Sequence, residues 1–257
     1  MIYFTDLDRT LIYSKKFTCG NEEEICIEKY NGEDISFMTK NSIQTLKDIL
    51  LKNQVIPCTT RSIEQFERIE FKKQGINFEW AIVCNGAYIL HNGKRLKEWD
   101  DILLKKLSEN ESFENIRKEF EKYKSIQGIL RVREVYNLFF YLVVDKEEYN
   151  EELLSEFISY LDKSGWDIHT SGRKVYFLPR ALKKENAVKF LSNYLNKKEF
   201  AALGDSSMDL NMIKISNKGY IPRDCYLTHK DIEVPIFVPK NKGLKGIEEI
   251  LLNILQK

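Results

Sequence analysis

The first eleven residues constrain the fold of this chain most strongly. A run of strand-forming residues, Ile2, Tyr3 and Phe4, leads into two carboxylates spaced by one residue, Asp6 and Asp8. Such a run without a polar break is typical of a short strand buried on both faces of a parallel sheet. Ligands of these sheets bind beyond the carboxyl ends of the strands, where both carboxylates fall. Two close aspartates repel, which favours a bound hard cation such as Mg²⁺, although an isolated pair is more commonly a polar turn.

Extended and helical patterns alternate after this run. Strands are expected at residues 55–58 and 81–84, each ending in polar residues, with helices over 39–53 and 63–75. This alternation predicts an α/β protein with a doubly wound parallel sheet. Two shorter strands flank Asn31-Gly32, a strong turn signal, and predict a hairpin over the end of the first strand.

The pattern changes from Ala87, where adjacent strands mix with helices. We expect a hairpin over 88–96, a charged helix over 102–124, and then strands at 129–135, 138–144, 166–169 and 174–178 around a helix near 153–161. Mixed segments of this kind indicate an inserted α+β domain. The predicted organisation is therefore a core of residues 1–87 and 179–257 with an insertion at 88–178. The last part returns to alternation, with a strand at 200–203 followed by the loop 204–209.

Composition excludes some classes of partner. The 257 residues carry 40 basic and 39 acidic side chains, so no global field favours nucleic acid or a membrane surface. Neither a membrane-spanning stretch nor a leader sequence is evident, and the five cysteines form no C-x-x-C pair, which predicts a cytoplasmic protein. The three histidines are too far apart to indicate a zinc site.

Four loops that lie just after predicted strands or before helices carry the chemistry. They are Asp6-Leu7-Asp8-Arg9-Thr10, Thr59-Thr60-Arg61, Lys183-Lys184 and Gly204-Asp205-Ser206-Ser207-Met208-Asp209. In this order and spacing they resemble the four motifs of the haloacid dehalogenase-like (HAD) phosphohydrolases. Asn85-Gly86-Ala87 and the insertion resemble the branch with a type C2 cap, the Cof-like and sucrose-phosphatase-like group. The resemblance spans nearly the whole chain.

The resemblance implies a role for each matching residue. Asp6 matches the nucleophile that forms an aspartyl-phosphate, and Asp8 matches the general acid and base. Thr59 matches the hydroxyl that hydrogen-bonds a phosphate oxygen, and Lys184 matches the lysine that offsets negative charge, with Lys183 as a close competitor. The implied cofactor is Mg²⁺. Its ligands would be the Asp6 carboxylate, the Asp8 carbonyl and the Asp205 carboxylate, and Asp209 would support them. Arg9, Thr60 and Met208 depart from the glycine, glycine and asparagine usual in the family.

Each residue also has a structural interpretation. Thr59 could cap the following helix, the lysines could be solvated charges, and Asp205 and Asp209 could be residues of a turn and a helix start. For a purely structural interpretation, all of these roles would have to hold at once. That is improbable, because every one of these residues lies where strand ends converge.

The expected substrate is a small phosphorylated metabolite, such as a sugar phosphate, bound by a monomer or homodimer. Expected substrate-binding residues are Thr60, Arg61, Asn85 and Gly86 in the core and Arg131, Arg133 and Arg173 in the insertion. The cationic residues of the insertion suit a second anionic group on the substrate.

Two other functions are compatible with parts of the sequence. A catalytically silent relative would serve as a binding or regulatory protein, although Asp6, Asp8, Lys184 and Asp205 are intact. A metal-dependent D-x-D glycosyltransferase would use the paired aspartates but would give no role to Thr59, Lys184 and Asp205. We therefore predict a Mg²⁺-dependent phosphohydrolase.

Overall fold

The computed structural model describes residues 1–257 except 19, 22, 226, 228–231 and 257, so Cys19 and His229 lie outside the described residues. The described chain divides into two compact units, Met1–Leu96 with Lys184–Lys257, and Lys97–Lys183. The cysteines that are described are free thiols, namely Cys26, Cys58, Cys84 and Cys225. Across the described residues, no helix combines the length and apolar character needed to cross a membrane.

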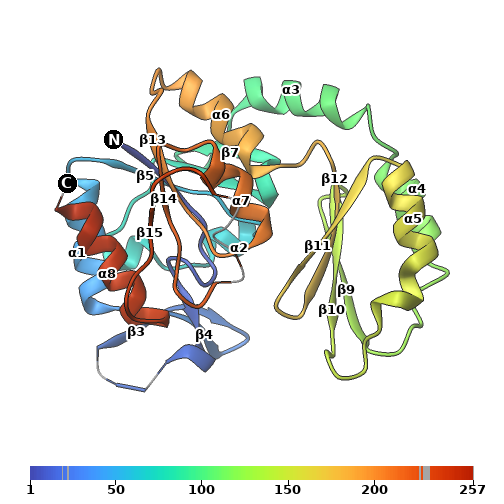
Figure 1. Cartoon of the computed structure of the whole chain (residues 1–257), viewed down its shortest axis with the longest axis horizontal. Coiled ribbons are helices and arrows are strands. Elements are labelled where there is room, and N and C mark those ends of the chain that lie inside the picture. The colour runs from blue at the N-terminus through green and yellow to red at the C-terminus, as the bar shows by residue number, and fades with distance from the viewer. Residues whose placement is uncertain (19, 22, 226, 228–231, 257) are drawn as a thin grey trace. The chain divides into compact units, whose positions relative to one another are not determined.

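The first unit is built on a parallel sheet in the order β15-β14-β13-β1-β5 (Figure 1). Its strands are β1 (Ile2–Thr5), β5 (Gln54–Pro57), β13 (Phe200–Leu203), β14 (Lys218–Tyr220) and β15 (Ile236–Phe237). In β1, Thr5 lies opposite Leu203 of β13 and Pro57 of β5, and the whole strand is buried. The α/β class with a doubly wound parallel sheet is confirmed.

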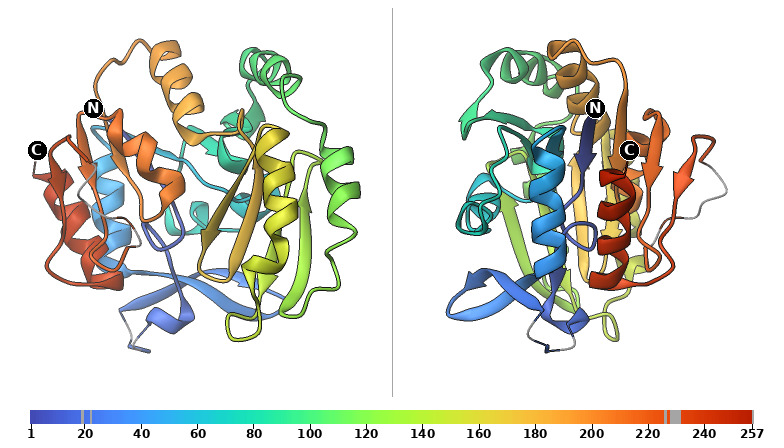
Figure 2. Two further views of the ribbon diagram at one scale, coloured as in Figure 1. Left: turned by 45° about the vertical axis from the view of Figure 1, so that its right-hand side comes forward. Right: turned by 90° about the vertical axis from the view of Figure 1, so that its left-hand side faces the viewer.

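Helices cover both faces of this sheet. Helices α1 (Lys40–Leu50) and α8 (Gly243–Leu255) lie side by side on one face, and α6 (Lys184–Tyr194) and α7 (Ser207–Lys214) lie on the other (Figures 1 and 2). Each fully buried aliphatic side chain at these contacts contributes about 1.5–3 kcal/mol. The cluster under α1 and α8 includes Tyr3, Leu46, Ile49, Val55, Ile247 and Ile250.

The strand expected at 81–84 departs from the predicted sheet. Strand β6 (Trp80–Val83) pairs antiparallel with β7 (Tyr88–His91), which pairs with β8 (Lys94–Arg95). It meets the end of β5 through a parallel bridge between Cys58 and Ile82. The Cys58 N–H donates to β1 and the Thr59 N–H donates to β6, so backbone N–H groups along this segment alternate between the two strands. By this alternation residue 57 faces β6, but Pro57 has no N–H to donate. Pairing of β6 with β5 is therefore confined to the strand end.

The boundaries of the compact units differ from those expected. They fall at 96/97 and 183/184, whereas the sequence predicted 87/88 and 178/179. The first shift follows from β7 and β8, which extend the sheet of β6. At the second boundary, Arg180 N–H donates to the Gly165 carbonyl at 2.8 Å, so the chain after β12 remains with the second unit.

A hairpin precedes α1. Strands β3 (Glu24–Tyr30) and β4 (Glu33–Thr39) pair antiparallel, and β4 also pairs with β2 (Tyr13–Ser14). Asn31 and Gly32 have φ values of 51° and 81°, the left-handed pair of a type I′ turn. The Thr39 hydroxyl then accepts from Ser42 N–H at 3.1 Å and begins α1. The predicted helix over 63–75 is shorter in the structure, as α2 (Ile63–Glu67) and a separate 3₁₀ turn.

The second unit is an antiparallel sheet in the order β11-β12-β10-β9, with α4 and α5 on one face (Figure 1). Its strands are β9 (Ile129–Val135), β10 (Phe139–Val144), β11 (Trp166–Ser171) and β12 (Lys174–Pro179), and its helices are α3 (Lys97–Leu107), α4 (Phe113–Phe120) and α5 (Ser155–Lys163). Phe120 and Phe157 of the helices pack on Phe140 and Phe177 of the sheet. The helix expected over 102–124 is divided because Ser112 caps α4 through Asn115 N–H. Within the described part of the chain, the 3₁₀ turns are η1 (Lys15–Phe17), η2 (Lys72–Gln74), η3 (Cys84–Gly86) and η4 (Glu151–Leu154).

Candidate functional site

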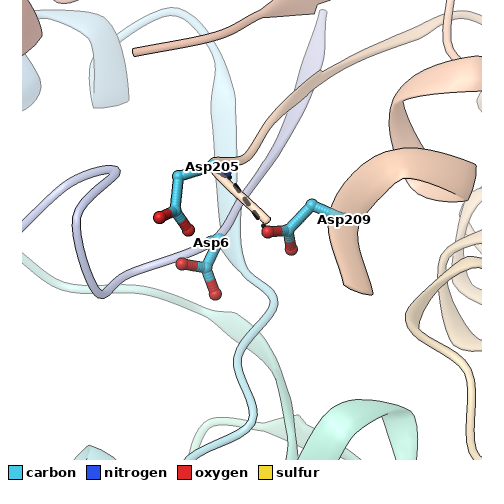
Figure 3. A group of neighbouring side chains, drawn as sticks. All are labelled: Asp6, Asp205 and Asp209. Atoms are coloured by element: carbon cyan, nitrogen blue, oxygen red, sulfur yellow. Dashed lines mark hydrogen bonds between the residues drawn. The ribbon is translucent and has the colours of Figure 1, made fainter. Parts of the chain in front are cut away.

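Buried carboxylates gather at the carboxyl edge of the parallel sheet. Asp6 follows β1, Asp205 follows the neighbouring β13, and Asp209 lies in the first turn of α7. Figure 3 shows the three side chains turned toward one another. Each offers a carboxylate oxygen, and these oxygens all lie within 4.8 Å of one another. Parallel pairing of β1 with β13 brings Asp6 and Asp205 together from positions that are remote in the sequence.

A buried lysine balances part of this charge. Lys184 Nζ lies 2.6 Å from Asp6 Oδ1 and 2.7 Å from Asp209 Oδ1, and the lysine side chain is only 1% exposed. Burial alone would lower the pKa of Lys184, but the charges of Asp209 and Asp6 outweigh it and raise that pKa. Lys183 instead lies in the second unit, where its Nζ is 3.8 Å from Asp167 Oδ2. Of the adjacent lysines, Lys184 therefore lies in the acidic cluster.

Asp209 is held by the loop that it closes. Its Oδ2 accepts from the Ser206 hydroxyl at 2.7 Å and from the backbone N–H groups of Ser206 and Asp205 at 3.1 and 3.3 Å. Gly204 permits this arrangement, because a Cβ at residue 204 would lie 2.3 Å from Asp209 Cβ. Since both oxygens of Asp209 already accept hydrogen bonds, this carboxylate supports the cluster more than it offers a ligand.

Negative charge in the cluster exceeds what Lys184 neutralises. Burial raises the pKa of Asp6 to about 7 against the opposing charge of Lys184. Burial, with the charges of Asp6 and Asp209, raises the pKa of Asp205 to about 8. Among the described residues, the buried Asp205 Oδ2 has no hydrogen-bond partner. Closely spaced buried carboxylate oxygens, one of them lacking a donor, fit a hard divalent cation such as Mg²⁺.

Asp8 lies at the same strand end but outside the cluster of carboxylate oxygens. Its side chain is 51% exposed and accepts two hydrogen bonds from Arg61, from Nε to Oδ2 and from Nη2 to Oδ1, both at 2.8 Å. Arg61 Nη1 also donates to Glu28 Oε1 at 2.7 Å. A planar guanidinium that binds a carboxylate through two parallel bonds fixes its orientation. Arg61 therefore orients Asp8.

Glu28, a residue that the sequence did not single out, completes this network. It lies on β3, is fully buried, and accepts from Arg61, from Arg68 Nε at 2.9 Å and from the Ser36 hydroxyl at 2.5 Å. Burial would raise the pKa of Glu28, but these hydrogen bonds and the charge of Arg61 outweigh burial and lower it. No pattern in the sequence marks a glutamate on a hairpin as buried. Ser206 was likewise missed, although its position three residues before Asp209 suits a helix start.

The remaining core residues line the adjoining loops. Thr59 is buried, and its hydroxyl accepts from Arg61 N–H at 3.2 Å. The alternative interpretation of Thr59 as a helix cap is wrong, because the Ser62 side chain caps α2 through Gln65 N–H. Asn85 N–H donates to the Thr59 carbonyl at 2.9 Å, and Asn85 and Gly86 have φ values of 57° and 94°. Thr60 follows Thr59 and is partly exposed.

The arginines predicted to bind substrate in the insertion belong to the second unit. Arg131 and Arg133 are exposed on β9, and Arg173 is exposed in the turn between β11 and β12. Cross-strand pairing places Arg133, Tyr141, Tyr176 and His169 in one row across the sheet. The rings of Tyr141 and Tyr176 lie 5.1 Å apart, and Lys174 Nζ lies 5.3 Å from the Tyr141 ring. The sequence did not identify the two tyrosines as members of this group.

An α/β protein with buried carboxylates at the carboxyl edge of its sheet belongs to the class that binds ligands at strand ends. Residues 96–222 match a family described as haloacid dehalogenase-like hydrolase. Over these residues, which are slightly less than half of the chain, the sequence is similar to that family, and the chain is a hydrolase. The matched region contains the predicted third and fourth motifs, and with them Lys184, Asp205 and Asp209. This assignment favours a hydrolase over the glycosyltransferase alternative.

Solved structures establish the same fold over the full chain. The sucrose-phosphatase from Synechocystis sp. PCC6803, solved with sucrose and phosphate, has a TM-score of 0.69 at 15% identity, covering 99% of this chain and 97% of that one. A trehalose-6-phosphate phosphatase related protein has a TM-score of 0.62 at 14% identity, covering 100% and 97%. A haloacid dehalogenase-like hydrolase from Bacillus subtilis has a TM-score of 0.57 at 17% identity, covering 100% and 92%. No curated protein matches the chain in sequence.

Proposed function

We propose that this hydrolase is a Mg²⁺-dependent phosphatase that cleaves a small phosphorylated metabolite through an aspartyl-phosphate on Asp6. The observation that carries the proposal is the pairing of buried Lys184 with both Asp6 and Asp209 beside Asp205. A phosphoryl group needs a nucleophile, positive charge and an acid within one site. Asp6, Lys184 and Asp8 would supply these.

In the first step, a carboxylate oxygen of Asp6 forms a bond to phosphorus while the bond from phosphorus to the leaving oxygen breaks. Asp8 gives a proton to that oxygen, so an alcohol leaves. In the second step, Asp8 takes a proton from water, whose oxygen bonds to phosphorus and releases phosphate and the Asp6 carboxylate. Lys184 offsets the negative charge of the phosphoryl group throughout.

The cation site would consist of Asp6, the Asp8 carbonyl and Asp205, with Asp209 in support. Bound Mg²⁺ would supply positive charge that screens the nucleophile from the phosphate and lowers the pKa values of its ligands. The Thr59 hydroxyl is proposed to donate a hydrogen bond to a phosphate oxygen. Thr60, Arg61, Asn85 and Gly86 are proposed to border the substrate, with Arg61 acting mainly by holding Asp8.

The proposed substrate class is a phosphomonoester whose leaving group carries hydroxyls or a second anion. Arg131, Arg133 and Arg173 would supply cations for such a group. Support comes from the row of Arg133, Tyr141, Tyr176 and His169, which combines charge with aromatic surface. One structural neighbour is a sucrose-phosphatase and another is a trehalose-6-phosphate phosphatase related protein, which favours a sugar phosphate.

Phosphate release from para-nitrophenyl phosphate and a panel of phosphorylated metabolites, with Mg²⁺ or with chelator, tests the proposal. Wild type should require Mg²⁺, and Asp6→Asn should abolish release. Asp101→Asn, at an exposed position of α3, is the matched control and should retain full activity. If Asp6→Asn releases phosphate as fast as wild type, the nucleophile assignment fails. If wild type releases nothing across the panel, a binding or regulatory protein becomes the better description.

A further inference from the structure

Arg9 places a second, unassigned cation beside the acidic cluster. Its Nε lies 3.6 Å from Asp205 Oδ2, and the two side chains are 19% and 5% exposed. The same guanidinium lies 3.7 Å from the Asp224 carboxylate, donates to the Asp224 carbonyl, and lies 5.1 Å from the centre of the Phe17 ring. Arg9 is thus fixed from several sides with its charge directed at Asp205.

The backbone of Arg9 is strained to permit this placement. Its φ is +63°, a left-handed conformation that costs a residue with a side chain about 1–2 kcal/mol. Glycine would occupy this position without that cost. The side chain therefore compensates for an unfavourable backbone, which is expected only if its contacts stabilise the folded chain.

We propose that Arg9 is a positioning residue that holds Asp205 in place and sets the divalent-cation affinity of the acidic cluster. The inference rests on the proposed cation site. Without a divalent cation, the guanidinium offsets part of the repulsion among Asp6, Asp205 and Asp209. When a cation binds, the same positive charge opposes it, because like charges a few ångströms apart repel in a partly buried site. Arg9 therefore stabilises the metal-free protein and weakens cation binding.

Three variants distinguish the effect of the positive charge of Arg9 from the effect of its strained backbone. Arg9→Gln removes the charge but keeps a comparable side chain in the same strained backbone. Arg9→Lys keeps the charge and provides the conservative rescue. Arg9→Asn is a second neutral variant whose side chain tolerates left-handed backbone, so a defect in folding of Arg9→Gln does not prevent the test.

The measurement is isothermal titration calorimetry of the full, EDTA-treated and dialysed chain with MgCl₂, together with melting temperatures without metal. The neutral variants should bind Mg²⁺ at least about fivefold more tightly than wild type and melt at lower temperature without metal, whereas Arg9→Lys should bind like wild type. A purely structural role would lower stability without tightening binding. Equal or weaker binding by both neutral variants overturns the inference.

Asp205→Asn distinguishes failure of the inference from failure of the cation site itself. If Asp205→Asn loses Mg²⁺ binding while the Arg9 variants bind like wild type, the site stands and the role of Arg9 is wrong. If wild type binds no Mg²⁺, or Asp205→Asn binds it as well as wild type, both the proposed site and the inference fail.

Discussion

Arg61 holds Asp8 through two parallel hydrogen bonds of 2.8 Å, from Nε to Oδ2 and from Nη2 to Oδ1. The same guanidinium reaches the buried Glu28 on hairpin strand β3. The hairpin is thereby connected to the proposed acid and base of the reaction. A residue far from phosphorus can therefore influence proton transfer by keeping Asp8 in one orientation.

Arg61→Lys should lower kcat/KM for para-nitrophenyl phosphate by about tenfold to a hundredfold, because a lysine cannot bind Asp8 through two parallel bonds and general acid–base catalysis depends on position. Arg68→Lys is the matched control, since Arg68 contacts Glu28 and no contact with Asp8 is seen among the described residues. Steady-state kinetics of the two variants check the prediction. Equal losses in both would show that the contact with Glu28 matters and the contact with Asp8 does not.

Lys184→Met should destabilise the metal-free protein by about 3–5 kcal/mol, because it leaves Asp6 and Asp209 buried without their cationic partner. Phosphatase activity should be lost as well. Lys183→Met, at the adjacent and partly exposed position, should change the free energy of unfolding by about 0.5 kcal/mol or less. Urea denaturation of both variants is the measurement, and similar effects of the two substitutions would contradict the assignment of Lys184.

The positions that the sequence predicts well are those defined by strand ends. The carboxyl edge of a parallel sheet collects the residues that follow its strands, so Asp6 and Asp205 could be brought together before the structure was known. The choice between Lys183 and Lys184 could not be made in this way. It depends on where α6 begins, and a shift of one residue moves a helix side chain by about 100°.

Other features depend on contacts that no local pattern encodes. Glu28 and Arg61 are separated by 33 residues, and the hairpin that carries Glu28 has no periodicity marking that residue as buried. The pairing of β6 with β5 is limited to a bridge between Cys58 and Ile82, next to Pro57, which has no N–H to donate. Arg9 was visible as a departure from a glycine, but its contact with Asp205 required the structure.

Stability should fall in acid through Glu28. Its pKa in the folded protein lies below the ordinary value of 4.5, because the hydrogen bonds and charge of Arg61 outweigh burial. The folded state therefore binds the proton less readily than the unfolded state, so the stabilisation is present above the ordinary pKa and is lost as pH falls through the folded value. The difference in free energy of unfolding between wild type and Glu28→Gln should shrink below about pH 4.5. Urea titrations from pH 6 to the acid limit, about pH 3, measure this difference. If the difference in free energy of unfolding between wild type and Glu28→Gln stays constant or increases in acid, Glu28 is not the group that makes stability fall at low pH.

Gly204→Ala should disturb the acidic cluster by displacing Asp209. The added Cβ would lie 2.3 Å from Asp209 Cβ, so either the strand end or α7 must move. Overpacking of this kind typically costs about 1–3 kcal/mol, and here it would also displace the carboxylate that contacts Lys184. Gly93→Ala provides the comparison, because residue 93 has a φ of +78° and nothing lies within 4 Å of its added Cβ. Thermal unfolding and phosphate release should separate the two, with Gly93→Ala losing some stability and no activity, and Gly204→Ala losing both. Full activity in Gly204→Ala would mean that the position of Asp209 is not critical for the reaction.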